Sequence, residues 1–158
     1  MKTLLVFLSI IVASGLLMVS IYNTLIDANS WGSDIPASIQ TARDYYKYVD
    51  PRNFFAIFGP INQLLILLAL IFFCKDSVSL RFYFGLSFLL YAIIVILTFA
   101  YFIPRDQILF TWSIQDHTEQ IRAASAQWIA MNWIRSALGL AGVLSSFKGL
   151  DIYYKLKH

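Results

Sequence analysis

Four long apolar runs constrain the fold of this chain more than any other feature of its sequence. They cover Thr3–Tyr22, Asn53–Cys74, Phe82–Ile103 and Gln127–Phe147. A helix needs about 20 mostly apolar residues to cross the ~30 Å of bilayer hydrocarbon, and each run is long enough. A water-soluble helix would instead show a narrow apolar stripe. The runs predict an all-α fold, an integral membrane four-helix bundle.

Composition and the rare residue types exclude several other classes. Only 13% of the residues are charged and 59% are hydrophobic, whereas a soluble domain carries about 25% charged residues. The single cysteine, Cys74, excludes an intramolecular disulfide. His117 and His158 lie outside the apolar runs, so ligands for a haem or a di-iron site are lacking, and we expect no metal and no cofactor. The net charge of +3 is dispersed, which argues against a nucleic-acid partner.

The flanks of the runs predict the orientation of the chain in a membrane. The first run follows Lys2 and could be a signal peptide, but its apolar core is long and no A-x-A site follows, so we expect a retained helix. An even number of helices places both ends on one side. Basic residues there outnumber those on the other side by six to five, which predicts cytoplasmic termini and a multi-pass protein of the cell (inner) membrane.

The first outer segment, Asn23–Arg52, is too long for a plain connector. Asp34 and Pro36 are typical of a helix start. The residues that follow form one apolar face, namely Ile35, Ile39, Ala42, Tyr46 and Val49. We therefore expect a short amphipathic helix over about 35–49 that either lies on the membrane surface or caps the bundle.

The fourth run carries the clearest polar pattern. Asp116 and Glu119 resemble a capping box, so helix four is expected to start near His117. The expected helices are thus about 3–22, 53–74, 82–103 and 117–147, in a single domain over 1–158. His117, Trp128, Asn132 and Arg135 share one face of helix four, because they recur at helical spacing.

Arg135 lies well inside its run, where a charge costs roughly 2.5–3.5 kcal/mol on insertion scales. The interiors of the four runs contain no acid, so its partner must be a neutral dipole, water, an edge acid such as Asp27 or Asp106, or an anionic ligand. The alternative is that the side chain extends to the lipid headgroups. Both readings remain open from the sequence.

Further polar and aromatic residues fall at a similar depth or just outside it. Asn62 follows Pro60 in helix two, and Asn23 and Tyr101 reach the same level; Asp27 and Trp31 lie just past helix one. Each also has a simpler structural role available, as an interhelical bond, an interfacial anchor or a solvated turn. We predict catalytic roles for Arg135, Asn132, Asn62 and Asp27, and ligand-binding roles for Trp128, Tyr101, Trp31, Asn23 and His117.

Three short motifs carry a resemblance to a known family. They are Pro60-Ile-Asn62, Tyr101-Phe-Ile-Pro104, and Trp128 followed by Asn132-Trp133-Ile-Arg135. With the helices from about Val19 to Phe147, this order resembles the anthrone-oxygenase-like family of small four-helix membrane proteins, many of whose bacterial members have no known activity. The resemblance implies a cofactor-free oxygenase that adds oxygen to an electron-rich anthrone and gives a quinone.

Such chemistry needs a base to remove an activated proton and donors to hold the enolate. Arg135, Asn132 and Asn62 could hold the oxyanion, and Asp27, Asp106 or His117 could act as the base. Because no acid or histidine stands beside Arg135 in the sequence, a second hypothesis is a non-catalytic membrane protein. It would bind a lipid or small lipophilic ligand, form a homo-oligomer, or serve as a subunit of a larger membrane complex. A transporter is the weaker third hypothesis, since no intramembrane carboxylate is available for proton coupling.

Overall fold

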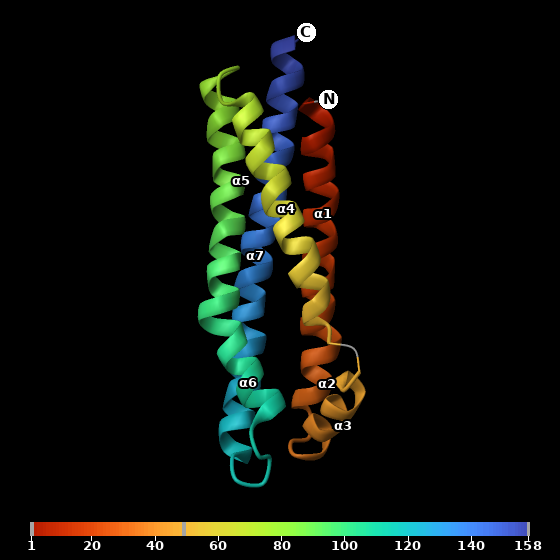
Figure 1. Cartoon of the computed structure of the whole chain (residues 1–158). Helices are drawn as coiled ribbons and strands as arrows, with labels where there is room; N and C mark the ends of the chain where they lie inside the picture. Colours follow the sequence, from red (N-terminus) through yellow and green to blue (C-terminus); the bar gives the residue numbers. More distant parts are fainter. Residues whose placement is uncertain (1, 49, 158) are drawn as a thin grey trace.

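The computed structural model describes residues 2–48 and 50–157, and every regular element in these ranges is helical. Four long helical stretches run side by side, and both ends of the chain lie at the same end of the molecule (Figure 1). The first stretch is α1 (Lys2–Tyr22), which continues through the π-helical turn η1 (Asn23–Ala28) into α2 (Asn29–Gly32). It ends ten residues beyond its apolar run, because polar residues after Tyr22 remain helical.

Helix α4 (Arg52–Phe73) matches its apolar run to within one residue at each end and includes Pro60. The two remaining long stretches extend past their runs. Helix α5 (Val78–Leu97) continues through the π-helical turn η2 (Thr98–Phe102) into α6 (Ile103–Thr111). Helix α7 (Thr118–Lys157) is the longest and ends well beyond the expected limit near residue 147. Asp116 accepts a hydrogen bond from the Ser113 hydroxyl at 2.7 Å, just before α7 begins.

Within the described ranges, three stretches are long and apolar enough to cross a membrane: Lys2–Gly32, Arg52–Phe73 and Val78–Thr111. These stretches support the prediction of a membrane protein. Helix α7 is not among them, although it packs between α1 and α5 (Figure 1). Its buried face carries serine, glycine, asparagine and arginine, which lower its mean hydropathy. The same small residues let α7 approach its neighbours closely.

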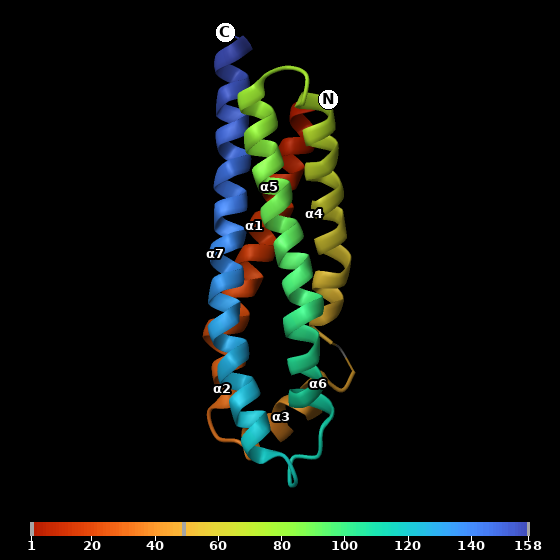
Figure 2. The ribbon, with the colours of Figure 1, turned by 90° about the vertical axis from the view of Figure 1, so that its left-hand side faces the viewer.

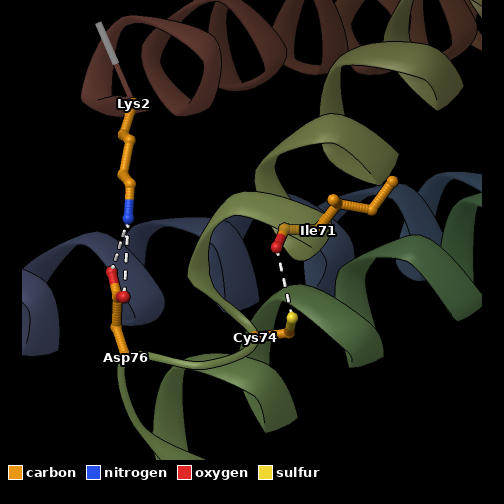
Figure 3. Close-up of polar contacts among 4 residues, drawn as sticks. All are labelled: Lys2, Ile71, Cys74 and Asp76. Carbon is orange, nitrogen blue, oxygen red and sulfur yellow. Dashed lines mark hydrogen bonds and ion pairs between the residues drawn. The ribbon is translucent and has the colours of Figure 1, made fainter.

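A tight apolar core fills the end that holds the termini. Phe73, Leu80 and Phe84 are fully buried there, and Gly149 of α7 leaves room for the Phe84 ring. A Cβ at position 149 would lie only 2.7 Å from Phe84 Cε1. At the surface of this end, Lys2 and Asp76 form an ion pair of 3.1 Å that joins the start of α1 to the turn after α4 (Figure 3).

A second core lies at the opposite end, where α3 (Ala37–Tyr46) packs against the tips of the long helices (Figure 2). Ile35 and Ile39 are buried there together with Phe102, Leu109 and Trp128. The expected amphipathic helix over 35–49 is therefore shorter, and its apolar face covers the end of the other helices. Val49, assigned to the same face, lies outside the described residues.

Arg43 fastens α3 to α6. Its guanidinium donates to the carbonyl of Leu109 at 2.9 Å and to that of Trp112 at 2.8 Å. These carbonyls belong to the end of α6, where the last turn of a helix has no intrahelical donors. Arg43 thus supplies hydrogen-bond donors to carbonyls at the end of α6 and holds α3 against that end.

Candidate functional site

A cavity of about 980 Å³ lies among the long helices and reaches α3. Ligand pockets for small molecules are typically about 300–1,000 Å³, so this volume suits a molecule of several rings. Aromatic and aliphatic side chains make up much of the wall, including Phe55 and Phe99, with polar groups set between them. The described residues hold no group of three or more histidine, cysteine, aspartate or glutamate side chains placed to bind a metal.

Arg135 contributes the charge in this wall. The residue is 8% exposed and lies on the face of α7 that lines the cavity. Its Cζ lies 4.1 Å from the ring centre of Phe102, 5.3 Å from that of Phe55 and 5.6 Å from that of Trp128. Faces of aromatic rings attract a cation at these distances. The guanidinium is therefore turned into the cavity among rings.

No acid of residues 2–48 and 50–157 forms an ion pair with Arg135. Within the described part of the chain, no carboxylate oxygen lies within the 4.0 Å of an ion pair with its guanidinium. Its Nε is also buried without a hydrogen-bond partner. The site thus presents a fixed cation whose donors are available to a guest molecule.

Other unpartnered polar atoms gather around the same cavity. Four buried side-chain atoms of the described residues have no hydrogen-bond partner, and all four belong to residues of the cavity wall: Trp31 Nε1, Gln63 Oε1, Tyr91 Oη and Arg135 Nε. Buried polar groups in proteins are nearly always bonded, either to protein or to water. Their concentration here indicates a space that water or a polar ligand occupies.

Three acids line the cavity and differ in their surroundings. Asp106 of α6 is half-buried and accepts a hydrogen bond from Trp128 Nε1 at 3.0 Å. Asp27 of η1 is also half-buried and lies on the α1 side. Asp50 is bound by Arg52, whose Nε donates to Asp50 Oδ2 at 2.6 Å. Burial acts to raise the pKa of Asp50, but the hydrogen bonds from Arg52 outweigh it and lower that pKa.

Tyr46 of α3 places a phenol at the capped end of the cavity. Burial, with the nearby negative charge of Asp27 as the next contribution, raises the pKa of Tyr46 to about 12. The hydroxyl therefore stays protonated at neutral pH and can donate a hydrogen bond.

Six of the nine residues predicted from the sequence line this one cavity: Arg135, Asn62, Asp27, Trp128, Trp31 and Asn23. Asn62 is buried and its Oδ1 accepts a hydrogen bond from Ser9 at 3.0 Å, which fixes the amide at the cavity wall. Trp31 and Trp128 meet edge to face, with ring centres 5.3 Å apart. Together they close the outer part of the space.

The other three predicted residues lie away from the cavity wall. Asn132 uses its amide nitrogen on the first helical stretch: Nδ2 donates to the Ser20 carbonyl of α1 at 2.8 Å and also to Thr24 Oγ1 of η1. Tyr101 points to the Gln127 carbonyl at 3.4 Å and carries the Arg105 guanidinium on its ring. His117 lies before α7, where its Nδ1 is 3.2 Å from the Ser113 carbonyl.

Several wall residues were not singled out from the sequence. Phe55 and Phe102 surround Arg135, and Asp106 had been considered only as an edge partner or base. The turn η2 explains why Phe102 occupies the place expected for its neighbour Tyr101. A π-helical turn includes an extra residue per turn, so the faces that follow it rotate. Both π-helical turns supply cavity residues, among them Asn23, Asp27, Thr98 and Phe102.

Comparison with known proteins decides the family. The family model described as anthrone oxygenase matches residues 52–145, more than half of the chain. The chain belongs to the anthrone oxygenase family. This confirms the resemblance carried by the three motifs, and the matched range of the anthrone oxygenase family includes Asn62, Asp106, Trp128 and Arg135. Comparisons with curated proteins and with solved structures find no match.

Proposed function

We propose that this anthrone oxygenase family protein is a four-helix bundle of the cell (inner) membrane with cytoplasmic termini. The three strongly apolar stretches and α7 would be the four spans, with α7 the most enclosed. Lys2, Lys75 and the lysines near the end of α7 lie at the end with the termini, which fits the positive-inside rule. The residues that line the cavity lie toward the other end of the helices. A lipophilic substrate would then reach the site from the membrane.

We propose further that the protein oxidises a small aromatic or quinone-like lipophile in this cavity without a cofactor. The observation that carries this is Arg135, buried, unpaired and surrounded by three aromatic rings in a cavity of about 980 Å³. Flat rings can lie against the wall while a carbonyl oxygen accepts hydrogen bonds from the guanidinium. Negative charge that develops on that oxygen would be stabilised by the guanidinium, which is already in place before the reaction.

In this proposal the reaction converts an activated CH₂ group into a carbonyl. Removal of one proton leaves an enolate, whose electrons are transferred to O₂ to form a carbon–oxygen bond. The resulting hydroperoxide loses water, so one oxygen atom becomes the carbonyl and the other leaves as H₂O. The protein supplies a base and a cation, and the electron-rich substrate supplies the electrons.

The second candidate is a non-catalytic protein that binds a lipid or a membrane partner. Arg43, Lys47 and Arg52 all line the outer part of the cavity, a placement that would also suit an anionic headgroup. Under this alternative the acyl chains would fill the apolar part of the space. A co-purifying lipid or subunit found by native mass spectrometry would favour it.

Turnover of anthrone by the protein purified into lipid nanodiscs tests the oxygenase proposal. We expect oxygen uptake with formation of anthraquinone in equal amounts, above the spontaneous rate. Arg135→Met should lower kcat/KM by about 10²–10³-fold, as for loss of an oxyanion donor. Arg81→Met, at the exposed start of α5, is the matched control. Equal rates for Arg135→Met and the wild type, or no turnover of any anthrone by the wild type, would leave the binding alternative.

A further inference from the structure

Asp106 and Arg135 are linked through one side chain. The indole of Trp128 donates from Nε1 to Asp106 Oδ1 at 3.0 Å, and its ring centre lies 5.6 Å from Arg135 Cζ. The two charged groups come from different elements, α6 and α7, and both line the cavity. They are not an ion pair, since their charged atoms are more than 4.0 Å apart. An acid and a cation thus lie in one cavity without neutralising each other by contact.

The second oxygen of Asp106 remains available. Trp128 is the side chain that bonds to this carboxylate among residues 2–48 and 50–157, and it occupies Oδ1. The indole bond fixes the orientation of the carboxylate, because Trp128 itself is 5% exposed and packed against Phe102 and Trp31. A fixed carboxylate with a free oxygen beside a cavity has the geometry of a proton acceptor.

The other two acids of the cavity are less suited to that role. Asp50 is committed to Arg52 through its side-chain and backbone hydrogen bonds. Asp27 lies on the α1 side, close enough to Tyr46 that its charge raises the pKa of that phenol. In the described part of the chain, neither acid bonds to a side chain that also contacts the Arg135 guanidinium.

We propose that Asp106 is the proton acceptor of this site and that it removes a proton from the activated CH₂ group of the substrate. In this step the C–H bond breaks, the proton passes to Asp106 Oδ2, and the electron pair remains in the ring system as an enolate. The enolate oxygen lies against the guanidinium of Arg135. The step consumes no oxygen, and it rests on the proposed function because it uses the same cavity and substrate.

If Asp106 is the proton acceptor, the site selects substrates by the acidity of their CH₂ group as well as by their shape. A flat aromatic ketone without an acidic CH₂ group, such as anthraquinone, would bind against the same rings and have no proton to lose. Anthrone has the acidic CH₂ group opposite its carbonyl. A ligand of this class can therefore place its oxygen toward Arg135 while its CH₂ group reaches Asp106.

Exchange of the anthrone CH₂ hydrogens with D₂O, measured under anaerobic conditions by NMR, tests the step without turnover. The wild-type protein in nanodiscs should accelerate exchange over the buffer rate, and Asp106→Asn should lower that acceleration by about 10²–10⁴-fold, the usual contribution of a general base. Asp106→Glu keeps a carboxylate and should retain part of it, which guards against a folding defect in the amide variant. Asp44→Asn makes the same charge change on the exposed face of α3 and is the control.

Binding, followed by quenching of tryptophan fluorescence with anthrone, separates the possible outcomes. We expect Asp106→Asn to bind anthrone within about threefold of the wild-type Kd while losing exchange. Exchange that persists in Asp106→Asn, or that is lost in Asp27→Asn instead, would overturn the assignment and leave the proposed function intact. Absence of anthrone binding by the wild type would overturn the proposed function, and this inference with it.

Discussion

Arg135 shows how this protein accommodates a buried charge. A lone charge inside a bilayer is costly, and most such groups pair with an acid. Here Phe55, Phe102 and Trp128 surround the guanidinium, and their faces supply the negative side of their quadrupoles. Each such contact stabilises the charge by roughly 0.5–2 kcal/mol, which offsets only part of the free-energy cost of desolvation. The remaining desolvation cost is typical of a charged residue that is kept inside a membrane protein for its function.

Replacing this charge should therefore separate stability from binding. We expect Arg135→Met to leave the thermal midpoint in detergent unchanged or raise it by a few degrees, because no acid loses its partner and the thioether fills the same space. Anthrone affinity should fall at least about tenfold, as expected for loss of a charge-assisted hydrogen bond. Thermal unfolding and fluorescence titration measure the two effects. A clear drop in the midpoint would show that the guanidinium is paired in the folded protein.

Asn132 illustrates the opposite case, a polar residue whose bonds are all used within the fold. Its amide joins α7 to Ser20 and Thr24 of the first stretch. Polar bonds between membrane helices average about 0.6 kcal/mol and reach about 1.7. We expect Asn132→Ala to lower the free energy of unfolding by about 1–2 kcal/mol, while turnover falls only with the folded fraction. A double-mutant cycle with Ser20→Ala measures the pair; a large kcat loss in fully folded protein would restore the predicted oxyanion role.

At the level of elements, the two π-helical turns mark the limit of pattern-based prediction. The apolar runs and the 3.6-residue period predicted where the long helices lie and which face of α7 carries Trp128 and Arg135. They could not predict η1 and η2, because a π-helical turn leaves no signature in hydrophobic periodicity. The exchange of Tyr101 for Phe102 at the site follows from η2. Asp106 was considered from the sequence as an edge partner of Arg135 or as a base, but its contact with Trp128 could not be predicted, since that contact depends on how α6 meets α7.

Helix ends were the other feature that the sequence predicted incompletely. Hydropathy marks where a helix is apolar, and α7 continues from residue 147 to Lys157 with polar residues on its exposed side. Those residues remain helical because Leu150 and its neighbours pack on the apolar core at the end with the termini. Burial of a few side chains, which depends on the other helices, decides the end point.

The close contact of α5 with α7 gives a prediction for a single glycine. A Cβ at Gly149 would lie 2.7 Å from Cε1 of Phe84, a side chain that is fully buried in the core. We expect Gly149→Ala to be destabilising, with overpacking of about 1–3 kcal/mol exceeding the helix-propensity gain of at most ~1 kcal/mol. Gly15→Ala is the matched control, since no atom lies within 4 Å of its added Cβ, and it should stabilise slightly. Unfolding in detergent measures both; rescue of Gly149→Ala by Phe84→Leu would confirm the contact, and an unchanged stability would contradict it.

The whole molecule is organised around two cores at opposite ends. The inner core lies beside the termini and is closed by the Lys2–Asp76 pair, whereas the outer core includes α3 and borders the cavity (Figures 1 and 3). The turn after α4 and the connection between α6 and α7 therefore lie at opposite ends of the helices (Figure 2). In a membrane they would face opposite sides.

This arrangement lets the single cysteine report the orientation. Cys74 lies in the turn after α4, at the end with the termini, and is partly exposed. A membrane-impermeant maleimide should label it in inverted vesicles and not in intact cells, if the termini are cytoplasmic. In Cys74→Ser with Ser113→Cys, the thiol moves to the exposed connection at the opposite end and the pattern should reverse. Labelling of Cys74 from outside intact cells would invert the proposed topology.

The position of the inner core determines which residues can be substituted without loss of the fold. Phe73, Leu80 and Phe84 hold the helices together at a distance from Arg135 and its aromatic neighbours. Changes to the rings around the guanidinium therefore leave the anchoring end intact. The ligand preference can therefore be changed by substituting one of these aromatic residues at a time. The scaffold is suited to stepwise redesign for ligands of different shape.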